Sequence, residues 1–170
     1  HACRENNLNL AKWLYKHGAS QDVTQANKNG FTPMYCACEF KHMNVVQWLY
    51  DHGASEDVTQ ANKDGFTPMY YACENNNPNV AQWLYNHGGS QDVMRIRLDT
   101  GLTPLYIALQ KKSMDVFKWI CSTFNWSMVV QSMETSCQHV STMRKKIGLP
   151  PWRQKSCGLV GWGCGMGPRN

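Results

Sequence analysis

One sequence pattern occurs three times in this chain at a constant interval. The tripeptide Trp-Leu-Tyr begins at Trp13, Trp48 and Trp83, positions that lie 35 residues apart. A Gly-Phe-Thr-Pro-Met-Tyr segment begins at Gly30 and again at Gly65, with the same spacing. A period of this length is typical of stacked supersecondary units, because one such unit cannot bury its apolar face without a neighbour. The sequence therefore predicts a repeat solenoid.

The residues of one unit predict two short helices, a turn between them and a loop after them. The Thr-Pro pair at 67–68 predicts the first helix start, since Thr caps free amides and Pro fits the first helical position. Three asparagines at 75–77 favour a turn, and Pro78 predicts the start of a second, amphipathic helix. Gly88 is expected to end that helix. The segment 53–65 ends in Lys-Asp-Gly, which predicts a projecting β-hairpin.

This order of elements resembles that of the ankyrin repeat. The Thr-Pro-Leu-His-x-Ala motif of that family, in a unit of about 33 residues, corresponds here to Thr-Pro-Met-Tyr-x-Ala beginning at Thr32 and Thr67. The resemblance covers residues 1–125. It implies an all-α repeat solenoid of helix-turn-helix plus β-hairpin units, with one partial and three further repeats starting near positions 1, 27, 62 and 98.

Two features depart from the family pattern. The motif histidine is replaced by Tyr35, Tyr70 and Tyr106, so the hydrogen bond that this histidine makes in the family is not expected here. The period exceeds the family value by two residues, and the extra residues fall between Ala54 and Val58. Their position predicts that the hairpin fingers are slightly longer than usual.

The two ends of the chain differ from its middle. Because His1 aligns with Cys36, the chain begins inside a first helix, and we expect it to be a fragment that lacks N-terminal repeats. Apolar residues recur every three or four positions over 126–147, which predicts an amphipathic helix that caps the last repeat. The Gly-rich, basic segment 148–170 is expected to be disordered.

The positive charge is confined to the C-terminal part. Residues 1–125 carry 11 Lys/Arg and 11 Asp/Glu, whereas residues 126–170 carry 6 Lys/Arg and a single acid, Glu134. A basic tail can attract nucleic acid or acidic lipid, but so few charges over so long a segment favour a solvated tail. No run of 18 apolar residues is present, so we expect no membrane-spanning helix. The sparse charge of the tail also argues against contact with a membrane surface.

The cysteines fit structural roles. Cys3, Cys38 and Cys73 share one repeat position, where Cys serves as a small buried hydrophobe. Equivalent positions of stacked repeats lie roughly 10 Å apart, too far for a disulfide. Together with the absence of paired zinc-binding spacing, this predicts a reduced, intracellular protein, cytoplasmic or nuclear, with no metal. The one metal-ligand set that can be assembled, which we do not favour, is Cys137, His139, Cys157 and Cys164.

Three further sets of residues recur once per repeat. The tryptophans on the second helices are predicted to form inter-repeat core, and the histidines before the closing glycine complement a helix C-terminus. The aspartates in the following loop are predicted to form turns, and His42 is expected to hydrogen-bond at the turn between helices. The sets are Trp13, Trp48, Trp83 and Trp119; His17, His52 and His87; and Asp22, Asp57 and Asp92.

The sequence contains no nucleophile elbow, phosphate-binding loop or paired acid motif. We therefore predict a monomeric, non-catalytic protein-protein interaction module, a scaffold or adaptor without a cofactor. One alternative is a partner-recruiting segment of a larger enzyme, such as a kinase or ubiquitin ligase. Another is nucleic-acid binding through the basic tail, which would weaken steeply with salt.

The resemblance implies that a protein partner binds the finger tips and the exposed, concave side of the first helices. Phe31 and Phe66 are the candidate anchors, because exposed aromatic rings beside mixed charges are typical of interfaces. The alternative is that both rings pack against their own hairpins. The candidate binding residues are Lys28, Asn29, Phe31, Lys63, Asp64, Phe66, Asp99, Thr100 and Leu102 on the fingers, and Arg4, Glu5, Glu39, Phe40, Glu74, Asn75, Gln110 and Lys111 on the first helices.

Overall fold

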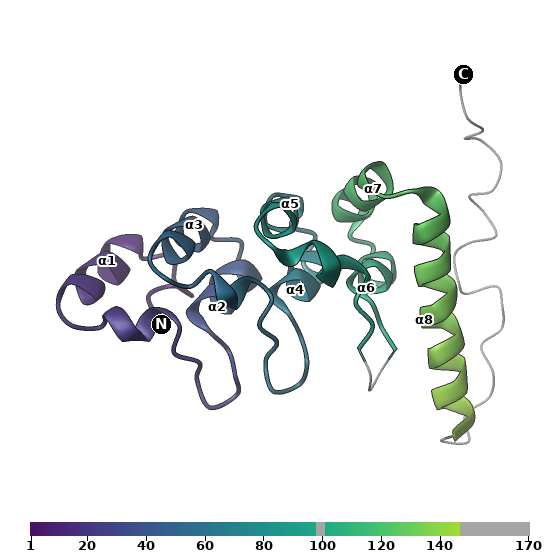
Figure 1. Ribbon diagram of the computed structural model, residues 1–170, viewed down its shortest axis with the longest axis horizontal. Helices are drawn as coiled ribbons and strands as arrows, with labels where there is room; N and C mark the ends of the chain where they lie inside the picture. Colours follow the sequence, from purple (N-terminus) through teal and green to yellow (C-terminus); the bar gives the residue numbers. More distant parts are fainter. Residues whose placement is uncertain (98–100, 147–170) are drawn as a thin grey trace.

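The computed structural model describes residues 1–97 and 101–146, without the side chains of residues 126 and 139–146. Pairs of antiparallel helices are stacked side by side in two rows, and loops project from the lower row (Figure 1). The first helices of the repeats are α2 (Pro33–Glu39), α4 (Pro68–Glu74) and α6 (Pro104–Gln110). The second helices are α1 (Leu8–Lys16), α3 (Met43–Asp51), α5 (Pro78–Asn86) and α7 (Met114–Thr123).

The helix boundaries follow from local sequence. The hydroxyl of Thr32 accepts a hydrogen bond from the amide of Tyr35 at 3.2 Å, and Pro33 occupies the first helical position. The same cap recurs at the starts of α4 and α6. After α4, Asn76 adopts a left-handed conformation with φ 51°, and Gly88 does so with φ 106° after α5. The predicted bounds of these helices are confirmed.

A single hydrophobic core runs through the stack. Met34, Leu49, Met69 and Leu84 are all at most 1% exposed and belong to one continuous cluster. Cys38 and Cys73 are fully buried within the same cluster, which confirms the small-hydrophobe prediction for them, whereas Cys3 is only half-buried against it. Among the described residues, no cysteine forms a disulfide.

Side-chain hydrogen bonds also join each repeat to the next. In each case a donor from the turn between two helices reaches a backbone carbonyl of the preceding repeat, which lies at the end of the first helix for Glu39 and Glu74 and in a turn for Arg4. His42 is therefore a hydrogen-bonding residue of the turn, as predicted. The donor and acceptor pairs are His42 with Arg4 (2.9 Å), Asn75 with Glu39 (3.2 Å) and Ser113 with Glu74 (3.0 Å).

The recurring tryptophans and histidines form stacked pairs on the second helices. The rings of Trp48 and His52 lie 4.5 Å apart, and Nδ1 of His52 donates to the carbonyl of Trp48 at 2.7 Å. Tyr15 of the preceding repeat contacts Trp48 edge-on at 5.6 Å. Trp48 is buried, at 9% exposed, and Trp83 is half-buried. The core prediction is wrong for Trp13, which is 55% exposed.

The loops between repeats differ from the prediction. No strand is present in residues 1–97 or 101–146, so the described fingers are tight turns and not β-hairpins. The two extra residues do not lengthen the fingers, because the segment that contains them forms a 3-10 turn, η2 (Glu56–Val58), equivalent to η1 (Ser20–Val23) and η3 (Gly89–Met94). Val58 is 1% exposed, so this added turn extends the core.

The loop aspartates are also more buried than expected of turn residues. Asp57 and Asp92 are 2% and 3% exposed, whereas Asp22 is exposed. Burial raises the pKa of the Asp57 carboxyl to about 6, although a hydrogen bond with Thr32 acts in the opposite direction. The cause is desolvation, which disfavours the charged form of a carboxyl group.

A long helix, α8 (Trp126–Lys146), stands at the end of the stack and packs against α6 and α7 (Figure 1). Among its described side chains, those of Val129, Met133 and Ser136 are buried. They repeat at intervals of four and three, the spacing of one helix face. The hydroxyl of Ser136 lies 3.4 Å from that of Thr103, which also caps α6. The Gly-rich segment 148–170 lies outside the described residues.

The different burial of two equivalent tryptophans gives a stability test. Trp48→Ala should lower the free energy of unfolding by about 3 to 5 kcal/mol, the usual cost of removing a buried Trp. Trp13→Ala, at the equivalent exposed position, should lower it by about 1 kcal/mol or less. Urea unfolding followed by circular dichroism measures both values, and equal losses in the two variants would contradict the structure.

Asp57 predicts a specific dependence of stability on pH. Its folded pKa lies above the unfolded value of about 3.9, so the stability present below pH 4 is lost as the pH rises through about 6. Asp57→Asn should therefore raise the free energy of unfolding at pH 7 by on the order of 1 to 3 kcal/mol, with little change at pH 4. The control is Asp22→Asn, at the exposed equivalent position. A difference between Asp57→Asn and wild type that is constant from pH 4 to 7 would refute this assignment.

Candidate protein-binding surface

The finger face, which we define as the tips of loops 27–31 and 62–66 together with the adjoining sides of α2 and α4, is built on locally fixed turns. The side-chain oxygen of Asn27 accepts hydrogen bonds from the amides of Asn29 (2.9 Å) and Phe31 (3.1 Å). The amide of Lys63 donates to the carbonyl of Asn29 at 3.2 Å, which ties the two fingers together. A Cβ at Gly30, whose φ is 83°, would lie 2.8 Å from the Lys63 nitrogen, so this contact requires glycine.

Phe66 is enclosed by residues of its own and the next finger. The guanidinium carbon of Arg97 lies 3.7 Å above the centre of the ring, and Tyr70 and Tyr71 lie at 4.6 and 5.5 Å. Arg97 is held in place by a hydrogen bond from Nη2 to the carbonyl of Asp64. The Phe66 ring therefore packs against the tyrosines of α4, and Arg97 covers one of its faces.

Phe31 has a similar support but lacks this cover. Its ring stacks on Tyr35 at 4.6 Å with an interplanar angle of 16°, and Tyr35 in turn contacts Tyr71 at 4.8 Å. Phe31 is half-buried and lines two neighbouring cavities of about 440 and 370 Å³. Of the two predicted anchors, Phe31 thus lies beside open space, whereas Phe66 is covered on one face by Arg97.

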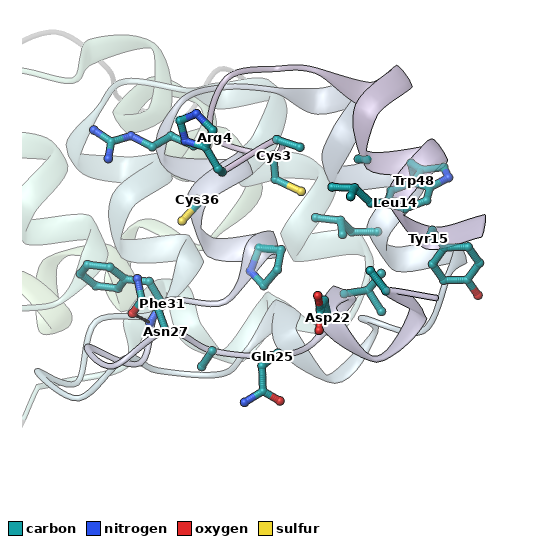
Figure 2. Close-up of a pocket in the computed structure, with 18 residues that line it drawn as sticks. Cys3, Arg4, Leu14, Tyr15, Asp22, Gln25, Asn27, Phe31, Cys36 and Trp48 are labelled. Atoms are coloured by element: carbon teal, nitrogen blue, oxygen red, sulfur yellow. Dashed lines mark hydrogen bonds between the residues drawn. The ribbon is translucent and has the colours of Figure 1, made fainter. Parts of the chain in front are cut away.

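The larger cavity lies between the first two repeats (Figure 2). Phe31 and Asn27 lie at one end of it and Leu14 at the other, with the thiols of Cys3 and Cys36 between them. Burial raises the pKa of both thiols above the usual range. Because the thiolate is the reactive form of cysteine, the two cysteines are poor nucleophiles. The walls of the cavity are mainly apolar.

Charged residues line the ends of the first helices. Phe40 is 39% exposed, and the guanidinium carbon of Arg4 lies 5.0 Å from the centre of its ring. Glu74 pairs with Lys111 of the next repeat at 3.0 Å. Partial burial raises the pKa of Glu39, the positive charge of Arg4 lowers it, and Glu74 adds a smaller increase. Charges of both signs and one exposed aromatic ring therefore lie along this edge.

The structure divides the predicted binding residues into three groups. The exposed residues can meet a partner directly, and the half-buried ones also support the surface. Asp99 and Thr100 lie outside the described residues. The exposed group is Arg4, Glu5, Lys28, Asn29, Phe40, Lys63, Asp64, Gln110 and Lys111, and the half-buried group is Phe31, Glu39, Phe66, Glu74, Asn75 and Leu102.

Three residues that help to form this surface were not predicted from the sequence. Cys36 lines both cavities, Tyr71 contacts Tyr35 and Phe66, and Arg97 covers Phe66. Tyr71 is the residue between Tyr70 and Ala72 in the repeat motif, so its position was visible in the sequence. Nothing in the sequence indicated the contact of Arg97, which belongs to the segment 94–97, where Met-Arg-Ile-Arg replaces the Thr-Gln-Ala-Asn of the preceding repeat.

Other kinds of site find little support in the described part of the chain. Over residues 1–97 and 101–146, no three or more His, Cys, Asp or Glu side chains are grouped so that they could hold a metal ion. The metal-ligand set weighed from the sequence falls largely on residues whose side chains are not described. Across the same part of the chain, no helix has both the length and the apolar character needed to cross a membrane.

Stacked helix pairs that begin with Thr-Pro, with loops projecting from one edge, define a helical repeat protein. The family model described as "Ankyrin repeats (many copies)" matches residues 1–49 and 37–85. The chain belongs to the ankyrin-repeat family, so the resemblance and the predicted helical repeat solenoid are confirmed, apart from the β-hairpins. Ankyrin repeats generally mediate protein-protein interaction and are typically non-catalytic. A comparison with curated proteins found no match.

The different surroundings of two phenylalanines on the finger face can be tested by stability. Phe66→Ala should lower the free energy of unfolding by about 2 kcal/mol, below the 3 to 5 kcal/mol typical of a fully buried ring. Phe40→Ala should lower it by less than about 1 kcal/mol because that ring is partly in solvent. Urea titrations of the two variants beside wild type provide the measurement. A larger loss for Phe40→Ala would show that the rings are assigned the wrong roles.

Proposed function

We propose that this chain is a non-catalytic scaffold or adaptor that binds a protein partner on the finger face. This proposal rests on the exposed charged residues and the half-buried ring of Phe31 on two fingers that a backbone hydrogen bond ties together. A surface that is ordered before binding loses less conformational entropy on association. A typical interface takes about 800 Å² from each partner, a plausible contribution from several neighbouring repeats.

The proposed interface has an aromatic centre and a charged rim. Phe31 and Phe40 line the smaller cavity beside the finger, where an apolar side chain of the partner can be buried. Lys28, Lys63 and Asp64 on the tips are exposed and supply the polar rim. This arrangement of an apolar centre and a polar rim is usual for protein interfaces. Burial raises the pKa of the Cys38 and Cys73 thiols, so both stay protonated. Free, buried thiols suit an intracellular, reducing environment.

Affinity capture with matched surface variants tests this proposal. The finger-face variant combines Lys28→Glu, Phe40→Ala and Lys63→Glu, three exposed positions that leave the core intact. Its control is Gln47→Ala with Gln82→Ala, two exposed positions on the second helices. Both must give the circular dichroism spectrum of wild type.

The expected result is that a partner bound by wild type and by the control is retained at least about tenfold less by the finger-face variant, since interface centres carry most of the binding energy. Equal retention by all three proteins would exclude the finger face as the binding site.

A further inference from the structure

Two groups of the α4 repeat are each covered by a cation from the α6 repeat. The guanidinium carbon of Arg97 lies 3.7 Å above the centre of the Phe66 ring, which comes just before α4. Nζ of Lys111 lies 3.0 Å from a carboxylate oxygen of Glu74, the last residue of α4. A ring face before this helix and a carboxylate at its end are therefore both matched with positive charge inside the chain.

The α2 repeat carries the same two groups 35 positions earlier, at Phe31 and Glu39. In the described part of the chain, no guanidinium or ammonium group lies over the Phe31 ring, and none forms an ion pair with the Glu39 carboxylate. The guanidinium of Arg4 lies over Phe40 instead, 5.0 Å from the ring centre. Burial raises the pKa of Glu39, and the charge of Arg4 opposes this effect only in part.

An asparagine holds the position from which a cation would cover Phe31. The amide of Asn62 donates to the carbonyl of Phe66. The amide of Arg97 donates in the same way to the carbonyl of Leu102, so Asn62 and Arg97 are equivalent. The side-chain oxygen of Asn62 accepts hydrogen bonds from the amides of Asp64 and Phe66, at 3.0 and 2.9 Å, and the residue is 6% exposed. This neutral side chain is therefore committed to its own finger.

A second asparagine holds the position from which a cation would pair with Glu39. Asn75 ends α4 as Lys111 ends α6, and its Nδ2 donates to the backbone carbonyl of Glu39 at 3.2 Å. In the next repeat Ser113 donates to the corresponding carbonyl of Glu74, which leaves Lys111 for the carboxylate. Both missing cations would come from the repeat that follows, so this difference does not depend on what precedes residue 1.

We propose that Phe31 and Glu39 form a receptor for an extended segment of a partner protein that carries two basic side chains two residues apart. The guanidinium of an arginine lies over the Phe31 ring, because this planar group stacks on aromatic faces. The second cation pairs with the Glu39 carboxylate. Each takes the place that the α6 repeat fills for the α4 repeat. The proposal names the chemistry of the partner of the finger face, and it rests on the function proposed above.

The spacing of the two groups fits such a segment. The Phe31 ring stacks on Tyr35 at 4.6 Å, and Glu39 follows Tyr35 by one helical turn on the same side of α2. At about 1.5 Å per residue, the two points lie roughly 6 Å apart along the helix. Alternate side chains of an extended segment lie on one side and about 7 Å apart. Phe31 and Glu39 also line one cavity of about 370 Å³, which can hold the apolar stem of an arginine.

Neighbouring charges disfavour a uniformly basic partner. Lys28 and Lys63 are exposed on the finger tips, and Arg4 is exposed beside Phe40. Like charges that meet across an interface are costly, and complementary ones set specificity. The tip lysines therefore favour an acidic residue of the partner. The expected segment has mixed charge, with an acid, an arginine and a second basic residue at alternate positions.

Peptide binding to the full chain tests this proposal. The probe is a short, blocked peptide with glutamate, arginine and lysine at alternate positions and small neutral residues elsewhere. Two companion peptides replace its arginine or its lysine with alanine, and a third places arginine and lysine next to each other. Each peptide is titrated calorimetrically into wild type, Phe31→Leu, Glu39→Gln and the control Asp51→Asn, which removes an exposed carboxylate from α3. All variants must keep the circular dichroism spectrum of wild type.

We expect each cation of the probe to depend on one side chain of the receptor. Removal of the arginine should weaken binding to wild type by at least about threefold, the range of a cation–π contact, with little effect on Phe31→Leu. Removal of the lysine should weaken binding to wild type and Asp51→Asn by a similar factor, with little effect on Glu39→Gln. Such pairwise coupling identifies the side chains that meet. Asn75→Lys supplies the cation from within the chain and should also make the lysine of the probe dispensable.

No measurable binding of the probe, equal losses in all proteins, or equal binding of the peptide with adjacent cations would overturn the proposal. The affinity capture described above separates this failure from that of the proposed function. A captured partner that the finger-face variant loses, together with a probe that shows no coupling, keeps the finger face and overturns the basic segment. A partner that this variant retains, together with a coupled probe, refutes the finger face as the capture site and keeps the receptor.

Light scattering of the chain at increasing concentration tests a different occupant. A monomer throughout supports a segment of a partner protein. Self-association that Glu39→Gln weakens would assign the receptor to a basic segment of a second copy and would overturn the choice of occupant.

Discussion

The structure depends on the burial of each repeat's apolar face by its neighbour. A helix pair of this size cannot enclose a core alone, and Val45, Trp48 and Leu49 of α3 are buried while the equivalent residues of α1 are exposed. Carbonyl groups at the ends of α2 and α4 accept hydrogen bonds from side chains of the following repeat. The burial of apolar side chains and the hydrogen bonding of these backbone carbonyls therefore both come from the same contact between repeats.

The finger face follows from this stacking. A single finger would hold its turn through one asparagine, but the hydrogen bond from Lys63 to Asn29 fixes one finger relative to the next. Phe31, Tyr35 and Tyr71 then form a continuous aromatic contact across two repeats. The surface available to a partner is consequently a property of adjacent repeats together, which suits recognition of a protein better than recognition of a small molecule.

The same contact also explains how the two ends of the described stack differ. At one end α8 lies against α6 and α7 and buries Val129 and Met133. This helix takes the side of the last repeat that another helix pair would otherwise cover. At the other end the stacked rings of Trp13 and His17 remain exposed although their geometry is complete. The stack is closed where α8 packs and open at α1.

The sequence alone determined the repeat architecture and the bounds of its helices. Thr-Pro starts, left-handed turn residues and closing glycines act within a few positions of the chain, so local patterns suffice to predict them. Most of the candidate finger residues could also be located by their place in the motif. The tertiary structure decided which of these side chains are open to a partner. Arg97 covers Phe66, Asp57 is buried in a 3-10 turn, and Trp48 is buried while Trp13 is not. These outcomes depend on side chains about 30 residues away in sequence, and identical repeats acquire different surroundings only when they are stacked.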